Sequence, residues 1–167
     1  MEERYFEGAD AVLNDIQNGR AFLIVKKDDK VNIMQIGWGF IGFMWNHPHL
    51  IVAVRPVRYT YQMIKDADEF VVSIPKKGEM KEELKLCGTA SGSEVDKAEV
   101  CKFEMIDSSL ISVPRIGGCR VSYECKITYR DHLDPEGLDA HINRGTYPQE
   151  DHHLLLMGRI VEIHMEQ

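Results

Sequence analysis

Hydrophobic and polar residues alternate most clearly late in the chain, between residues 121 and 130. The odd positions of this stretch are apolar or aromatic: Val121, Tyr123, Cys125, Ile127 and Tyr129. The even positions are polar or charged, beginning with Ser122 and Glu124. A period of two is typical of a β-strand with one buried and one solvated face. The pattern therefore predicts a strand over residues 121–130 with its even-numbered side chains in water.

Shorter apolar runs bounded by turn residues predict the other strands. They cover residues 20–27, 30–38, 50–56, 70–75 and 153–165. Pro56 and Pro75 end two of these runs. Gly158, inside the last run, predicts a bulge or a bend.

Helical patterns are short. Residues 8–19, 59–69 and 79–88 suit helices, and the first and third end at a glycine. Residues 91–103 suit a loop followed by one or two helical turns. Residues 131–151 are rich in Asp, His, Pro and Gly, and we expect a long loop there, which in a compact domain is usually functional or flexible.

The order of these elements predicts the fold class. Most strands follow one another without a full-length helix between them, which argues against an alternating parallel sheet. We expect a mainly β protein, an antiparallel barrel with short peripheral helices. A length of 167 residues suits a single domain over residues 1–167.

Composition and charge narrow the classes of partner. The 20 basic residues are outnumbered by 27 acidic ones, for a net charge of −7, so neither nucleic acid nor an anionic membrane is expected as a partner. A small anionic ligand needs only a few local cations. The first residues lack an apolar signal segment and no apolar run reaches 18 residues, so we expect a cytoplasmic protein. The four cysteines form no C-x-x-C pair and are expected to be reduced thiols.

The stretch GWGFIG, residues 37–42, has the G-x-G-x-x-G spacing of dinucleotide-binding folds. That site needs a helix to begin within the glycines, but Pro48 and its neighbouring turn residues exclude a useful helix there. Two explanations stay open. The glycines bend a barrel strand and pack under aromatic rings. Alternatively, they remove side chains so that a flat ligand can lie against the backbone near Trp38 and Trp45.

Other constellations give weaker signals. His47 and His49 form H-x-H, and Asp151 to His153 form a second cluster, but Pro48 separates the first pair and nothing brings the clusters together. We therefore predict no metal site. There is no G-x-S-x-G, so no hydrolase is indicated, and no side chain is predicted to act as a catalytic acid or base. Cys87 is expected to be a small buried residue.

Several blocks of the chain, in order, are similar to a known family. They are NIMQIGW (32–38), NHPHLIVAVRPVRYTYQMI (46–64), EFVVSIP (69–75), LCGTASGSEVDK (86–97), YECKI (123–127) and HHLLLMGRIV (152–161). From about residue 20 to 163 the chain resembles the flavin reductase-like family, which consists of FMN-binding split β-barrel proteins and includes flavoredoxin. The first family block often reads M-T-x-S-W, whereas here Gln35 and Gly37 replace the threonine and serine.

The resemblance implies an FMN site in a homodimer, near the subunit interface. The residues it implies as cofactor contacts are Met34, Gln35, Ile36, Gly37, Trp38, Gly39, Arg58, Tyr59, Thr60, Ser91, Gly92, Lys97 and His153. Chemistry supports part of this set: Arg58 can fork onto phosphate oxygens, and Thr60 and the amides of a helix N-terminus can face an anion. From the residues alone, a surface ion pair for Arg58 and a plain helix cap for Thr60 are the favoured interpretations. Asp96 is expected to cap the turn that follows it.

The resemblance also implies the reaction. NADH or NADPH would dock over bound FMN and pass a hydride from the nicotinamide to flavin N5, with His153 bordering the substrate side. A flavoredoxin-like electron carrier that holds FMN and exchanges electrons with a redox protein partner is an alternative. A non-redox barrel that binds another ligand is a second alternative. We also expect a valine at Gly39 to allow folding but exclude the flavin, and a serine at Gly37 to be tolerated.

Overall fold

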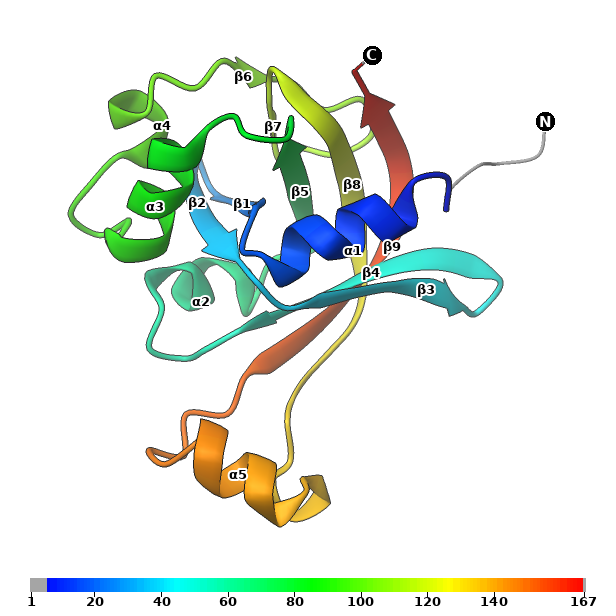
Figure 1. The fold of residues 1–167 in the computed structure, drawn as a ribbon, viewed down its shortest axis with the longest axis vertical. Coiled ribbons are helices and arrows are strands. Elements are labelled where there is room, and N and C mark those ends of the chain that lie inside the picture. The colour runs from blue at the N-terminus through cyan, green and yellow to red at the C-terminus, as the bar shows by residue number, and fades with distance from the viewer. Residues whose placement is uncertain (1–5, 167) are drawn as a thin grey trace.

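A computed structural model describes residues 6–166 and contains a seven-stranded sheet (Figure 1). The strands of this sheet are β1 (Ala21–Lys27), β2 (Lys30–Ile36), β3 (Gly39–Met44), β4 (His47–Val54), β5 (Glu69–Pro75), β8 (Cys119–His132) and β9 (Leu154–Met165). Their order is β2-β1-β5-β8-β9-β4-β3, and every neighbouring pair is antiparallel. Two short strands, β6 (Met105–Ile106) and β7 (Arg115–Ile116), form a separate ribbon.

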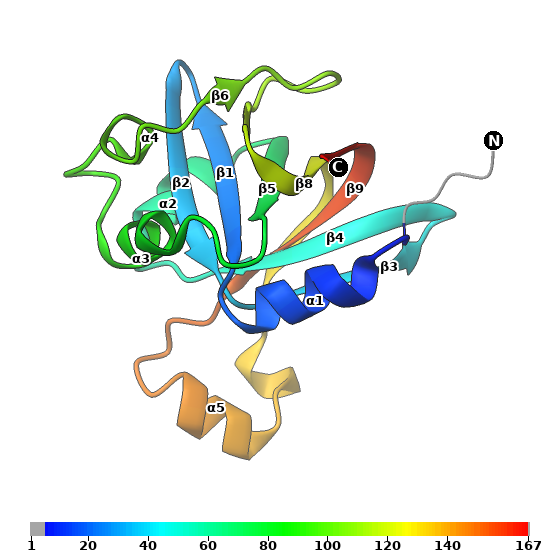
Figure 2. The same cartoon turned by 45° about the horizontal axis from the view of Figure 1, so that its top comes forward.

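Short helices surround the sheet. They are α1 (Ala9–Gln17), α2 (Tyr59–Ile64), α3 (Lys81–Thr89), α4 (Lys97–Val100), the 3-10 turn η1 (Pro135–Gly137) and α5 (Ala140–Thr146). Helices α3 and α4 pack against β2, α2 against β1, and α1 against β3 (Figure 2). Across residues 6–166, no helix has the length and apolar character needed to span a membrane.

The two edge strands of the sheet are neighbours along the chain. β2 and β3 lie at opposite ends of the sheet order, yet only Gly37 and Trp38 separate them in sequence. The three steps from the end of β2 to the start of β3 span at most about 11 Å, so the sheet must curl until its edges approach each other. This curl makes the sheet a split barrel, and the predicted mainly β, antiparallel fold class is confirmed.

The stretch GWGFIG forms the crossing between these edges and most of β3. No helix follows it. A hairpin turn at Trp45 and Asn46, with φ of 50° and 58°, leads directly into β4. Two consecutive residues with positive φ are typical of the tight turns that fit twisted hairpins. The structure thus rules out the dinucleotide-type glycine loop, and it adds a strand, β3, that the sequence analysis does not predict.

Apolar side chains fill both faces of the central strands. One cluster includes Leu23, Val25 and Tyr123, and a second includes Phe22 and Ile24. Consecutive residues of β1 therefore enter opposite cores, which explains why AFLIV is a continuous apolar run and not an alternating one.

The solvated face predicted for residues 121–130 is only partly present. Ser122 and Glu124 are buried, and Ser122 shares a 2.8 Å hydrogen bond with Ser73. The Glu124 carboxylate accepts hydrogen bonds from the backbone N–H groups of Ser109 and Leu110 at 2.7 and 2.9 Å. The loop between β6 and β7 therefore covers this half of β8. At Ser122 and Glu124 the polar positions of the alternating pattern are buried and hydrogen-bonded. The prediction that these two positions face water was wrong.

The bulge predicted near Gly158 is confirmed. Gly158 pairs with Ile127, and the next pair is Met157 with Tyr129, so the extra residue, Thr128, lies in β8. A Cβ on Gly158 would lie 2.5 Å from the Phe70 ring. The glycine therefore provides room for an aromatic ring of the core as well as for the bend.

Residues 131–151 are not the uninterrupted loop that composition suggests. Asp134 caps η1, and the Asp139 carboxylate accepts from two backbone N–H groups at the start of α5. The aspartates that resemble loop residues are helix caps. Helix α5 has no buried residue and stands away from the sheet (Figure 1).

Candidate functional site

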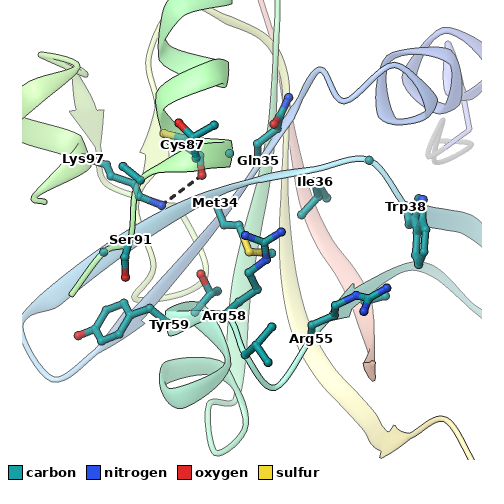
Figure 3. A pocket seen from close by; sticks show the side chains of 18 of the residues that line it. Met34, Gln35, Ile36, Trp38, Arg55, Arg58, Tyr59, Cys87, Ser91 and Lys97 are labelled. Atoms are coloured by element: carbon teal, nitrogen blue, oxygen red, sulfur yellow. Dashed lines mark hydrogen bonds between the residues drawn. The ribbon is translucent and has the colours of Figure 1, made fainter. Parts of the chain in front are cut away.

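A cavity of about 360 Å³ opens beside β2, within the size range usual for small-molecule sites. Its walls come from the end of β2 and the crossing to β3, the end of β4, the start of α2, the C-terminal end of α3 and the loop after it, α4, and the residue before β9. Segments far apart in sequence thus meet around one space (Figure 3).

The predicted contact residues, with the exception of Gly39, line this cavity. They are Met34, Gln35, Ile36, Gly37, Trp38, Arg58, Tyr59, Thr60, Ser91, Gly92, Lys97 and His153. The sequence analysis missed further wall residues: Ala53, Arg55, Val57, Cys87, Gly88, Thr89 and Ala90. Arg55 could have been found, because it lies on the same short segment as Arg58, directly after β4.

The cavity is positively charged in an acidic protein. Arg55, Arg58 and Lys97 line it, whereas no Asp or Glu of residues 6–166 does. Figure 3 shows Lys97, Ser91 and Tyr59 toward one end, and Arg55 and Trp38 toward the other. The chain as a whole carries a net charge of −7. Such a local reversal of sign favours an anionic ligand.

Lys97 is a buried ammonium group without a carboxylate partner in the described chain. It is 5% exposed, and its Nζ donates to the backbone oxygens of Ile33 at 2.8 Å and Cys87 at 3.2 Å. An ammonium group has three N–H donors, so one remains for a ligand. Burial lowers the pKa of Lys97, and the nearby Arg58 lowers it further. An anion in the cavity would relieve both effects.

Arg58 precedes α2 and is exposed at the cavity wall. Within residues 6–166 its guanidinium makes neither an ion pair nor a hydrogen bond, so the surface ion-pair alternative finds no support. Arg55 differs, because its guanidinium donates to Asp151 at 2.7 Å and to the Thr146 carbonyl at 2.9 Å. Arg58 is therefore the arginine whose donors are available to a ligand.

Two glycines allow the cavity walls to approach each other. A Cβ on Gly92 would collide with the Asn32 side chain, which donates to the Thr60 hydroxyl at 2.8 Å. A Cβ on Gly88 would collide with the Gln35 side chain. Gln35 itself donates to the Gly19 carbonyl at 2.6 Å, so it links β2 to the turn after α1.

His153 and Trp38 form the opposite wall. Their ring centroids are 4.9 Å apart, with the planes tilted by 44°. His153 is buried, and this burial, assisted by the positive charge of Arg55, lowers its pKa to about 4. The imidazole is therefore neutral near pH 7.

Trp38 also borders a second, apolar cavity of about 620 Å³ between α1 and β3, β4 and β9. Gly39 lines this second cavity and not the first. A Cβ on Gly39 would lie 3.0 Å from the Ile51 carbonyl, whereas one on Gly37 would make only ordinary contacts. Close packing against β4 therefore accounts for Gly39, and this observation favours the structural explanation of the glycine stretch over ligand approach at that residue.

The remaining candidates have structural partners. His49 bonds to the His47 carbonyl and to Thr128, and no group of three metal-ligating side chains forms within the described residues. Asp96 caps α4 as expected. The four cysteines are free thiols, and burial raises the pKa of Cys87 to about 12, so this thiol stays protonated.

Comparison with known proteins agrees with this architecture. The model of the flavin reductase like domain matches residues 14–167, and the chain belongs to this family. An uncharacterized protein of Archaeoglobus fulgidus is 32% identical over 130 residues, which cover 75% of this chain and 72% of the relative.

Two solved structures are similar to the whole barrel. Flavoredoxin from Methanosarcina acetivorans has a TM-score of 0.70 and 25% identity, over 88% of this chain and 68% of that one. The FMN-binding protein from Thermus thermophilus, solved with bound p-hydroxybenzaldehyde, has a TM-score of 0.68 and 24% identity, over 88% and 71% of the two chains. At 24% identity, the similarity to the Thermus thermophilus protein establishes the fold alone.

Proposed function

We propose that this protein is an FMN-binding flavoprotein with oxidoreductase activity. The observation that carries the proposal is that two uncompensated cations line one cavity. Lys97 is buried without a carboxylate, and Arg58 has no partner in the described chain. A dianionic phosphate would satisfy both cations at once. Membership of the flavin reductase like family, and the name of the flavoredoxin among the similar structures, support FMN as the molecule that carries this phosphate.

The described residues fit FMN along its length. Arg58, Lys97 and the hydroxyl-bearing loop at Ser91 would hold the phosphate, and Gly92 keeps that loop close to Asn32. The edge of β2 at Met34 and Ile36 would lie along the flavin ring. FMN, when bound, supplies the hydride- and electron-accepting chemistry. The role of the protein is to orient the ring and to limit access of water.

We propose NADH or NADPH as the hydride source. The wall formed by Trp38, Arg55 and His153 is the part of the cavity where a second flat molecule could enter, and the Trp38 side chain is 55% exposed. Arg55 supplies positive charge that suits a phosphate-bearing nucleotide. We propose that the chain orients its ligands, and that the hydride chemistry belongs to the nucleotide and the flavin.

An electron carrier is the second candidate. The similarity to flavoredoxin at 25% identity favours it, and such a carrier would exchange electrons with a redox protein partner. Both candidates share the FMN site and differ in whether a nicotinamide nucleotide reacts.

An absorption spectrum tests both candidates together. The protein is purified, supplied with FMN and freed of excess ligand, and its visible spectrum is then followed anaerobically with NADH or NADPH. We expect retained flavin absorption that bleaches at a saturable rate. Retained flavin without bleaching would favour the carrier, and loss of all flavin would refute FMN binding.

We also propose a homodimer in the cytoplasm. Phe40 is 65% exposed and, with Leu13 and Trp38, borders the apolar cavity between α1 and β3. Burying such a patch against a second copy would remove apolar surface from water. Light scattering should give twice the chain mass, and Phe40→Glu should yield monomers, whereas a monomeric wild type would contradict the proposal.

A further inference from the structure

Tyr147 joins the α5 segment to the wall of the cavity. Its hydroxyl lies 2.8 Å from Nδ1 of His153, and its ring stacks on His152 with centroids 4.5 Å apart. The Arg55 guanidinium also lies over the Tyr147 ring, 5.1 Å from its centre. Arg55 is fixed in turn by Asp151. Tyr147 is thus clamped by three neighbours and is 5% exposed.

Counting protons leaves two possible arrangements for the Tyr147–His153 hydrogen bond. Burial lowers the pKa of His153 to about 4, so near pH 7 the ring is neutral and carries one N–H. Burial raises the pKa of Tyr147, so its O–H is retained. One proton lies between the two atoms, and either the phenol or Nδ1 supplies it.

The surroundings of the phenol decide between these arrangements. If Nδ1–H were the donor, the phenol proton would need another acceptor, but within residues 6–166 the Tyr147 hydroxyl has no other hydrogen-bond acceptor and little access to water. The O–H therefore donates to Nδ1, and the ring proton of His153 resides on Nε2.

We propose that Tyr147 is a positioning residue that holds His153 as the Nε2–H tautomer, so that a neutral donor faces a carbonyl or carboxamide oxygen of the cavity ligand. Nε2 has no protein partner within residues 6–166, and His153 lines the cavity. Trp38 packs on the His153 ring and limits its rotation. The identity of the ligand rests on the proposed function, whereas the tautomer does not.

Nitrogen-15 NMR of the histidine rings tests the tautomer in FMN-free protein at pH 7. The His153 signals are assigned by their loss in His153→Gln. We expect a protonated Nε2 and an unprotonated Nδ1 in the wild type, and a shift toward mixed tautomers in Tyr147→Phe, which keeps the ring. Tyr61→Phe is the matched control. The Tyr61 hydroxyl lies 3.1 Å from Nε2 of His132, and neither residue lines the cavity. This substitution should therefore change only the His132 signals.

Two outcomes would overturn the positioning role. One is a wild-type His153 protonated on Nδ1, which is decisive even if Tyr147→Phe does not fold. The other is a folded Tyr147→Phe with an unchanged tautomer.

The source of the ligand oxygen is tested by adding FMN first and oxidised nicotinamide nucleotide second. A shift of Nε2 on the first addition assigns a flavin carbonyl, and a shift on the second assigns the carboxamide. No shift on either would refute the donor role. Failure of FMN to bind would refute the proposed function and with it the donor role, but the tautomer would still be measured.

Discussion

At the scale of single residues, buried Lys97 determines the chemistry of the site. A lysine that is 5% exposed usually has a carboxylate nearby, because burial of an uncompensated charge is costly. Here two backbone oxygens take that place, and one N–H is left over. The sequence motif SGSEVDK predicts a cation in a loop but gives no indication of burial, since burial depends on the distant strand β2.

Arg58 should contribute more to ligand binding than to folding. We expect Arg58→Ala to weaken FMN binding by about 1.5–3 kcal/mol, the usual value of a hydrogen bond to a charged group. Its free energy of unfolding should change by less than about 0.5 kcal/mol, because the residue is exposed and unpaired in the described chain. Calorimetric titration and urea unfolding measure the two quantities.

Arg159 provides the matched control for this substitution. It is exposed on β9 and lies outside the lining of the cavity. Arg159→Ala should leave FMN affinity unchanged. Equal losses in the two variants would mean that general charge, and not a phosphate contact, accounts for the effect.

His153 should make stability depend on pH. Its pKa falls from 6.5 to about 4 on folding, mainly through burial, with Arg55 and Arg58 lowering it and Asp151 opposing them. Between these values the unfolded chain binds a proton that the folded protein does not. The free energy of unfolding therefore decreases as the pH falls through this window, by about 2 kcal/mol from pH 7 to pH 5.

Urea unfolding at the two pH values measures this dependence. His153→Gln cannot titrate and should lose most of it. Burial raises the pKa of Glu124, but hydrogen bonds from Ser109 and His164 lower it below its normal value. Protonation of Glu124 therefore reduces stability only at still lower pH. If His153→Gln lost as much stability as the wild type between pH 7 and pH 5, the assignment of this pH dependence to His153 would be contradicted.

At the scale of elements, strands with clear flanking signals could be predicted from sequence, whereas β3 could not. Its residues, GFIGFM, contain two glycines and no polar side chain, so no alternation marks this edge strand, which pairs only with β4. The buried half of β8 was misjudged for the opposite reason. Its polar residues do alternate, but Ser122 and Glu124 are hydrogen-bonded beneath the β6–β7 loop. A periodic pattern shows which positions of a strand are polar. It does not show whether a loop from elsewhere in the chain buries them.

The glycines of the β2–β3 crossing should differ in their tolerance. Gly37→Ser should fold normally, because an added Cβ meets only ordinary contacts, and it adds a hydroxyl at the cavity wall. Gly39→Val should lower the free energy of unfolding by about 1–3 kcal/mol, because its Cβ would press on the Ile51 carbonyl. Thermal melts with flavin content per chain distinguish the two.

This expectation replaces the one drawn from sequence, in which a valine at Gly39 folds and excludes the flavin. Gly42→Ala is the control, since nothing lies within 4 Å of its added Cβ. A stable Gly39→Val protein devoid of flavin would restore the ligand-contact hypothesis.

Gly158 tests the packing of β9 against the core. We expect Gly158→Ala to destabilise the fold by about 1–3 kcal/mol, because its Cβ would lie 2.5 Å from the Phe70 ring and 2.7 Å from Cys125. Urea unfolding of Gly158→Ala beside Gly158→Ala/Phe70→Leu measures the effect. If the smaller side chain at residue 70 recovers none of the loss, strain in the bulge and not contact with the ring is responsible.

At the scale of the whole molecule, ordered sequence blocks predict the site better than any single motif does. The contact residues converge because the curl of the sheet brings β2, the end of β4 and the start of β9 around one space. The family resemblance predicted, without any structural information, most of the residues that line this cavity. It could not convey that Arg55 bonds to Asp151, or that Tyr147 bonds to His153, since Asp151 and Tyr147 lie outside the matched sequence blocks.

Ligand selectivity follows from the charge distribution around the cavity. We propose that Lys97 and Arg58 hold one terminal phosphate, and no second group of unpaired cations lines the cavity within residues 6–166. FMN should therefore bind at least as tightly as FAD. Riboflavin, which lacks the phosphate, should bind more weakly by the contribution of the charged hydrogen bonds, about 1.5–3 kcal/mol or more.

Calorimetric titration of the wild-type protein with FMN, riboflavin and FAD tests the central claim most directly. We predict one FMN per chain, an affinity for riboflavin at least tenfold lower, and no advantage for FAD. Equal affinity for riboflavin and FMN would show that the Lys97–Arg58 end does not hold a phosphate. Absence of FMN binding would contradict the account as a whole.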